Sequence, residues 1–115
     1  MAIQINKNAI KQAEKLIKAG EITTFDTNWQ EEKPTSDEIN HYLSAHSMDE
    51  YGTWFLGEDM SVQKNLKEHY VYPYGDLKTV QKAALLDTIN RAEKADLKDI
   101  VQIAKRLLEL VEEQA

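Results

Sequence analysis

The fold is decided by residues 70–76, Tyr70-Val71-Tyr72-Pro73-Tyr74-Gly75-Asp76. Aromatic and β-branched side chains favour a strand here, and Pro73 belongs at a strand end or sheet edge because it has no N–H to donate. Gly75 allows a tight turn, and Asp76 can accept hydrogen bonds from the first free N–H groups of a helix. We therefore expect a strand, a turn, and a long helix capped by Asp76.

A second apolar run, Trp54 to Leu56, ends at Gly57 and is typical of a short strand. The polar segment 58–65 separates this run from the Tyr70 strand, so we expect the two to pair antiparallel across a loop. Trp54 lies in the densest apolar cluster of the chain, which predicts a buried ring. Residues 22–25 are a weaker strand candidate, and Trp29 must cover apolar surface from within a polar connector.

Helix-capping signals divide the first half of the chain. An asparagine at position 6 or 8 caps a helix that runs to about Lys18, with Gly20 just past its end. Two capping boxes, each a hydroxyl residue followed three positions later by glutamate, predict further helix starts. These boxes are Thr35 with Glu38, for a helix that ends near His46, and Ser47 with Glu50.

Two amphipathic helices are expected to follow the turn at Gly75. The first covers residues 77–92, and the second has the most regular apolar spacing in the chain. Its stripe is Leu97, Ile100, Val101, Ala104, Leu107, Leu108 and Val111. A short link near Ala95 favours antiparallel packing of the two helices. Ile103 and Leu110 widen the stripe, which indicates either burial on two sides or contact with a second copy or a partner.

The predicted fold class is α+β and mainly α, in one compact domain spanning residues 1–115. It contains four to five helices, one small antiparallel two-stranded β element and the C-terminal antiparallel helix pair. A chain of 115 residues with 42% hydrophobic content is large enough for a core without covalent staples. It contains no cysteine, which excludes disulfides, thiolate metal sites and cysteine nucleophiles.

Composition and charge also limit the cellular compartment and the partners that we expect. No apolar run approaches membrane-spanning length or resembles a signal-peptide core, so we expect a soluble cytoplasmic protein and no membrane partner. The net charge is −6, and residues 21–60 hold ten acids and one lysine. Such a surface repels phosphate backbones, so nucleic acid is not an expected partner, whereas a basic protein would be attracted.

The sequence shows no grouping of residues that is typical of a catalytic or metal site. His41 and His46 would be separated by about 140° around a helix, so they do not share a face. The side chains of adjacent acids, as at Asp49-Glu50, would also point in different directions around a helix. No serine lies in the glycine-flanked turn that is typical of a nucleophilic serine. We predict no catalytic residue, cofactor or metal ligand. The candidate interaction or groove surface consists of Tyr70, Tyr72, Tyr74, Ile103 and Leu110.

The chain resembles a family of small uncharacterised bacterial proteins. The resemblance covers most of its length and rests on a Tyr-Gly-x-Trp-x-Leu-Gly run, found here at residues 51–57, and a Tyr-x-x-Pro-Tyr-Gly-Asp run at 70–76. Arg91-Ala92 matches an Arg-Ala pair in the family's long helix. The chain departs from the pattern at residues 80–82, where members often carry an arginine, and at Ser47, where glycine is common. The resemblance implies one compact unit and assigns no activity.

Three function classes remain open. The preferred one is a protein-interaction or regulatory module, which includes a homodimer, because acids are concentrated in residues 21–60 and the last helix has a wide apolar face. The second is a small-ligand-binding protein or enzyme that uses the aromatic strand region 54–76. The third is an acidic mimic of nucleic acid. We lean away from an enzyme, because no titratable groups with a catalytic spacing are visible.

Overall fold

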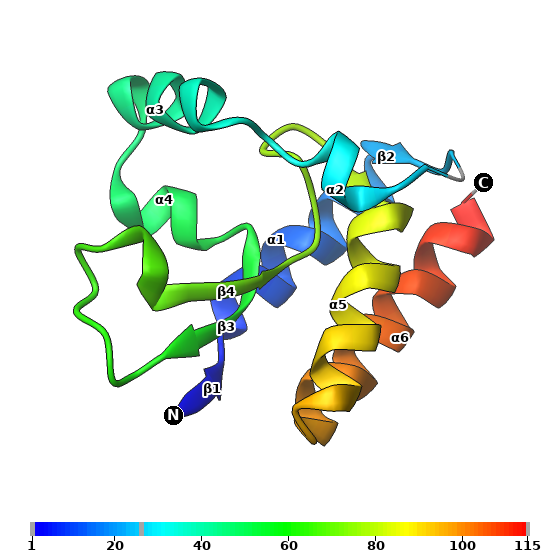
Figure 1. Cartoon of the computed structure of the whole chain (residues 1–115). Coiled ribbons are helices and arrows are strands. Elements are labelled where there is room, and N and C mark those ends of the chain that lie inside the picture. The colour runs from blue at the N-terminus through cyan, green and yellow to red at the C-terminus, as the bar shows by residue number, and fades with distance from the viewer. Residues whose placement is uncertain (1, 26, 115) are drawn as a thin grey trace.

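The computed structural model describes residues 2–25 and 27–114 and has the predicted α+β, mainly helical character (Figure 1). Its elements in chain order are β1 (Ile3–Ile5), α1 (Lys7–Lys18), β2 (Ile22–Thr23), α2 (Trp29–Glu32), α3 (Ser36–Ala45), α4 (Met48–Gly52), β3 (Phe55–Asp59), the 3-10 turn η1 (Lys67–His69), β4 (Tyr70–Pro73), β5 (Val80–Gln81), α5 (Lys82–Lys94) and α6 (Lys98–Gln114). The described residues thus form more helices than the four to five predicted, because α2 is a single short turn with no periodicity of its own.

The predicted pairing of the two aromatic strands is confirmed, but the sheet is larger than predicted. β3 and β4 pair antiparallel with Gly57 opposite Val71, and β1 adds to the other side of β3 with Ile3 opposite Asp59. The strand order is β1-β3-β4, so β4 lies at an edge of this sheet. A separate parallel pair joins β2 to β5. Both β1 and β5 are too short for sequence alternation to reveal them.

The predicted cap at Asp76 is wrong, because α5 begins six residues later at Lys82. Asp76 instead closes the turn before β5. Its Oδ1 accepts hydrogen bonds from the backbone N of Lys78 at 3.1 Å and of Thr79 at 2.7 Å, and its Oδ2 accepts one from Nε2 of Gln81 at 2.8 Å. Leu77 has a φ of 70°, which no helix interior allows. The acid therefore serves a turn and not a helix.

The C-terminal helices form the expected pair, and α6 returns alongside α5 in Figure 1. α6 also packs against α1, so its wide apolar face meets a helix on two sides. Ile100, Ala104, Leu107 and Val111 are buried at helical spacing in the main core. The three helices α1, α5 and α6 are called the helical layer below. Among the described residues, no helix is long and apolar enough to cross a membrane.

The predicted helix caps on the N-terminal side are present. Asn6 caps α1, and both capping boxes are complete. Asn6 is buried, and its Nδ2 donates a hydrogen bond to the carbonyl oxygen of Gly52 at 2.9 Å. This bond attaches the start of α1 to the end of α4. The helical layer is thereby fixed to the segment 28–79, called the aromatic half below, which carries α2, α3, α4, β3 and β4.

Candidate functional site: an aromatic groove

The three tyrosines of the predicted surface have different positions. Tyr70 and Tyr72 line a groove, although only 7% and 8% of their surface is exposed. Tyr74 is fully buried, its ring stacks on Trp54, and its hydroxyl donates a hydrogen bond to the carbonyl oxygen of Thr53 at 2.7 Å. Burial raises the pKa of the Tyr74 phenol. Tyr74 is therefore part of the core, which corrects its place in the predicted surface. Trp54, 4% exposed, is core as predicted.

The two predicted surface residues on α6 are separate from this groove. Ile103 and Leu110 are half-buried and pack against the main core. Contact of α6 with both α5 and α1 accounts for the wide apolar face of that helix. Arg106 of α6 also reaches Glu14 of α1, with Nη2 at 3.4 Å from Oε2. Packing within the chain covers part of both side chains, and their remaining exposed surface stays a predicted contact for a second copy or a partner.

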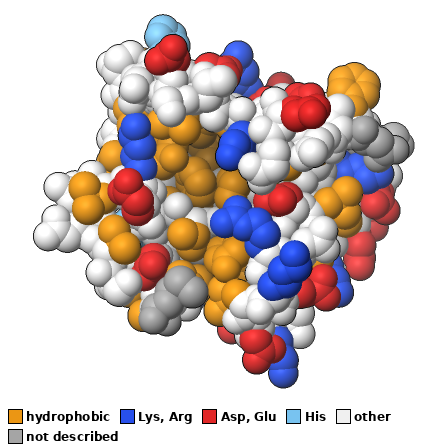
Figure 2. Space-filling model, in the orientation of Figure 1, with side chains coloured by type: hydrophobic (Ala, Val, Ile, Leu, Met, Phe, Trp, Pro, Cys, Tyr) orange, Lys and Arg blue, Asp and Glu red, His pale blue; other side chains and the backbone are white. Residues whose placement is uncertain are grey.

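The aromatic groove has a volume of about 260 Å³ and lies between α2, α3 and β4. Figure 2 shows hydrophobic side chains gathered in the hollow below α3, with both basic and acidic side chains around its margin. Beside the buried tyrosines, several apolar lining residues keep part of their surface exposed. These half-buried residues are Pro34, Ile39, Phe55, Val71, Pro73 and Leu77.

The groove runs along β4. All four residues of that strand, Tyr70 to Pro73, line it. Phe55 of β3, which pairs with Pro73, also lines it, so the groove covers part of the face of the β3–β4 pair as well. β4 is the last strand of its sheet, so no strand of the described residues lies beside its outer edge.

The opposite wall comes from α3 and from the segment that precedes it. α3 starts at its capping box and has no fully buried residue among Ser36–Ala45. Ile39 provides its contribution to the groove. Trp29 of α2 is buried against Ala83 and Ala84 of α5, which accounts for a tryptophan within a polar connector. This anchor places Lys33 and Pro34 at the rim.

Two groove residues have strained backbones. Tyr72 has a φ of 65° and Leu77 a φ of 70°, although bulky side chains disfavour this left-handed region. The remaining non-glycine residue with positive φ, among those the structure describes, is Asp96 in the link between α5 and α6. A left-handed residue is ordinary after a helix end. Backbone strain at bulky residues tends to occur at ligand-binding and active sites, and both instances here lie in the groove.

The groove is basic within an acidic chain. Lys33 and Arg91 line it, and no acidic residue is among the described lining residues. The Arg91 guanidinium lies 5.7 Å from the centre of the Tyr72 ring, within cation–π range. Its ion pair with Asp87 is long, at 3.7 Å, and the arginine side chain is 55% exposed. The Asp87 oxygen in this pair is buried and has no hydrogen-bond partner, so Arg91 also balances that carboxylate, and only the exposed part of its guanidinium faces a ligand.

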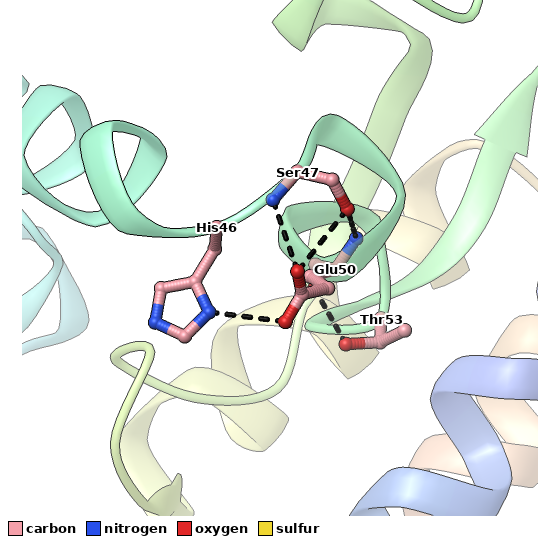
Figure 3. A network of polar contacts seen from close by, with 4 residues as sticks. All are labelled: His46, Ser47, Glu50 and Thr53. Carbon is pink, nitrogen blue, oxygen red and sulfur yellow. Dashed lines mark hydrogen bonds and ion pairs between the residues drawn. The ribbon is translucent and has the colours of Figure 1, made fainter.

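A polar network at the start of α4 has a structural role (Figure 3). Glu50 Oε1 accepts a hydrogen bond from the backbone N of Ser47 at 3.1 Å, and Oε2 lies 3.0 Å from Nδ1 of His46. The bond to His46, followed by the bond to Ser47, lowers the pKa of the Glu50 carboxyl. These contacts complete the capping box and hold His46 against Tyr42, whose ring stacks at 4.1 Å.

The remaining histidines do not form a reactive centre with this network. His69 is buried, and its ring nitrogens lie 2.8 Å from the carbonyl oxygen of Val62 and 3.0 Å from Oε1 of Glu58. These contacts fasten the loop between β3 and β4. His41 is exposed on α3. Across residues 2–25 and 27–114, no group of three or more histidine or acidic side chains is placed to hold a metal ion.

Several groove residues could not be found from the sequence. Ile39, Leu77 and Arg91 belong to three different segments, and only the fold brings them to one surface. The sequence signal available for these residues was Trp29, because an aromatic residue within a polar connector indicates that its ring packs against another part of the chain. No family model, curated protein or solved structure matches the chain.

Proposed function

We propose that this chain is a protein-interaction module that binds a partner through the aromatic groove. The observation that supports this proposal is a half-buried apolar surface beside the unpaired edge of β4. Exposed apolar patches of this kind mark interaction sites in soluble proteins. We also propose that the protein acts in the cytoplasm and belongs to the bacterial family that its sequence resembles.

The chemistry of the lining favours binding over catalysis. The titratable side chains of the groove are tyrosines with Lys33 and Arg91, and the described lining contains no carboxylate or imidazole. General acid–base catalysis near neutral pH normally uses one of those groups. Tyr51 and Tyr70 have pKa values raised above the usual tyrosine range, chiefly by burial, which keeps both phenols neutral.

A small ligand is the second candidate. The volume of about 260 Å³ lies just below the range of about 300 to 1,000 Å³ that is typical of ligand sites. The aromatic walls would suit a flat apolar molecule. Native mass spectrometry of the protein purified under mild conditions tests this candidate, because a resident molecule would add a discrete mass that unfolding removes.

Site-specific photo-crosslinking tests the proposed function. A photoreactive phenylalanine analogue replaces Ile39 in the groove, and a matched variant carries it at Gln102, which is exposed on α6. After illumination in extract of the native cell, we expect a discrete protein adduct at position 39 and none at 102. Identical adducts at both positions, or none at 39, would reject the groove as a protein-binding surface.

A further inference from the structure

We propose that the groove binds an extended acidic segment of a partner protein, which adds as a short strand to the free edge of β4. This inference rests on the proposed function and specifies the chemistry of the partner. It commits to a peptide with apolar side chains for the groove and a carboxylate for its basic rim.

The conformation of the partner follows from the strand edge. An edge strand presents unpaired N–H and C=O groups, and an extended peptide can pair with them while its alternate side chains enter flanking pockets. The available edge is short. Pro73 has no N–H, and its carbonyl oxygen already accepts a hydrogen bond from Oγ1 of Thr88 at 2.7 Å. The N–H of Tyr70 likewise already donates to the carbonyl oxygen of Lys67. The donors available at this edge therefore lie within Val71–Tyr72, and the inserted segment spans only a few residues.

The apolar character of the partner follows from the groove walls. Ile39 on one side and Phe55, Val71 and Leu77 on the other keep part of their apolar surface exposed. An apolar side chain lying between them removes water from both walls, at about 25 cal/mol per Å² buried. α3 has no fully buried residue of its own. A bound segment would thus supply α3 with apolar contacts beyond those the chain gives it.

The acidic character follows from charge complementarity. Lys33 and Arg91 line a groove that holds no described acid, although the whole chain has a net charge of −6. The Arg91 guanidinium lies over the ring of Tyr72, which also lines the groove. Arginine presents a planar fork that matches a carboxylate with two hydrogen bonds. The two basic side chains therefore favour an acidic segment, although Asp87 shares the charge of Arg91 and the groove walls belong partly to the acid-rich residues 21–60.

The decisive experiment compares two synthetic peptides that differ only in the sign of their charge. Both have a phenylalanine-valine-phenylalanine core and blocked ends, flanked by glutamates in one and lysines in the other. Binding is followed by amide chemical shifts of the ¹⁵N-labelled protein. We expect shifts at Ile39, Tyr70–Tyr72 and Arg91, and affinity for the glutamate peptide higher by about tenfold or more. Equal affinity, a preference for the lysine peptide, shifts that map elsewhere, or no binding by either peptide up to about 1 mM would overturn the inference.

A charge-reversed variant provides the second arm. Lys33→Glu combined with Arg91→Glu should reverse the preference toward the lysine peptide. The matched control is Lys98→Glu combined with Lys105→Glu, which makes the same net change at exposed positions of α6 and should leave the preference unchanged. A reversal in the control, or none in the groove variant, would contradict the role of the rim.

The strand geometry has its own test. A glutamate peptide with N-methyl groups on its alternate core amides cannot donate those hydrogen bonds, so we expect its affinity to fall by about tenfold or more. Unchanged affinity would reject strand addition. Failure of the peptides remains distinguishable from failure of the proposed function, because a protein adduct at position 39 would still identify the groove as an interaction surface for a partner of other chemistry.

Discussion

The helical layer and the aromatic half bury apolar residues in different ways. In α6, Ile100, Ala104, Leu107 and Val111 are each almost completely covered by neighbouring helices. In the aromatic half, α3 buries no residue fully, and Ile39 remains partly exposed beside the groove. Regular periodicity thus gives a closed core, whereas clustered aromatic residues on short elements give a core with an open side. Binding is expected on the open side.

The largest expected effect tests whether the aromatic half has a firm base beneath its groove. Trp54→Ala removes a ring that is 4% exposed and stacks on Tyr74 at 5.3 Å between centres. We expect a loss of about 3 to 5 kcal/mol in the free energy of unfolding, because the truncation leaves a cavity in the core. Urea denaturation measures the loss. Parental stability would mean that the aromatic half does not depend on this stack.

A pair of truncations then compares the two regions directly. Leu107→Ala, in the helical layer, should cost about 2 to 5 kcal/mol, because Leu107 is 1% exposed. Ile39→Ala, in the groove wall, should cost about 1 kcal/mol or less and weaken peptide binding. Thermal and urea unfolding of both variants measure the difference. Equal losses would show that α3 is as firmly packed as α6, which contradicts the contrast between the two regions.

A smaller effect concerns the turn at the end of the aromatic half, just before β5. Asp76→Ala removes the acceptor for Lys78, Thr79 and Gln81, so we expect a loss of about 1 to 3 kcal/mol. The damage should stay in the turn. In this variant, amides in the first turn of α5 should exchange hydrogen faster only by the amount that the overall loss of stability predicts. Selective loss of protection in that turn would restore Asp76 as a helix cap.

The smallest expected effect is a pH dependence located in the aromatic half. The pKa of Glu38 is lowered mainly by the hydrogen bond from the Thr35 backbone, and that of Glu50 mainly by the bond to His46. Because the unfolded chain takes up these protons at higher pH than the folded chain, stability is full above about pH 5 and falls as the pH decreases through about 4. Urea midpoints across this range measure the slope. Glu38→Gln combined with Glu50→Gln should flatten it, and an unchanged slope would assign the effect to other carboxyls.

Sequence patterns predicted the elements whose contacts are local or strongly periodic. The two capping boxes, the α6 stripe and the pairing of the strands near Trp54 and Tyr70 all follow from spacing along the chain. β1 and β5 were missed because strands of two or three residues show no alternation. Asp76 was misassigned because the same side chain can cap a helix or close a turn, and only the positive φ of Leu77 distinguishes the two.

The groove was predicted only in part, for a related reason. Tyr70 and Tyr72 were identified from the aromatic strand, yet Ile39 and Arg91 come from segments whose own patterns indicate ordinary helices. An open apolar wall arises from how separate segments meet, and it leaves no mark in the periodicity of any one of them. The basic rim was hidden for the same reason, since it uses only two of the fourteen lysines and arginines of an acidic chain.

The attachment of β1 to β3 has a consequence for synthesis of the chain. Residues 3–5 leave the ribosome well before residues 57–59, with which they pair. Asn6 likewise waits for Gly52, 46 residues further along. Because such non-local contacts close a long loop, they form late and slow the folding of the sheet. α1 has only 12 residues, which makes an isolated helix marginal in water, and its docking must await translation of β3.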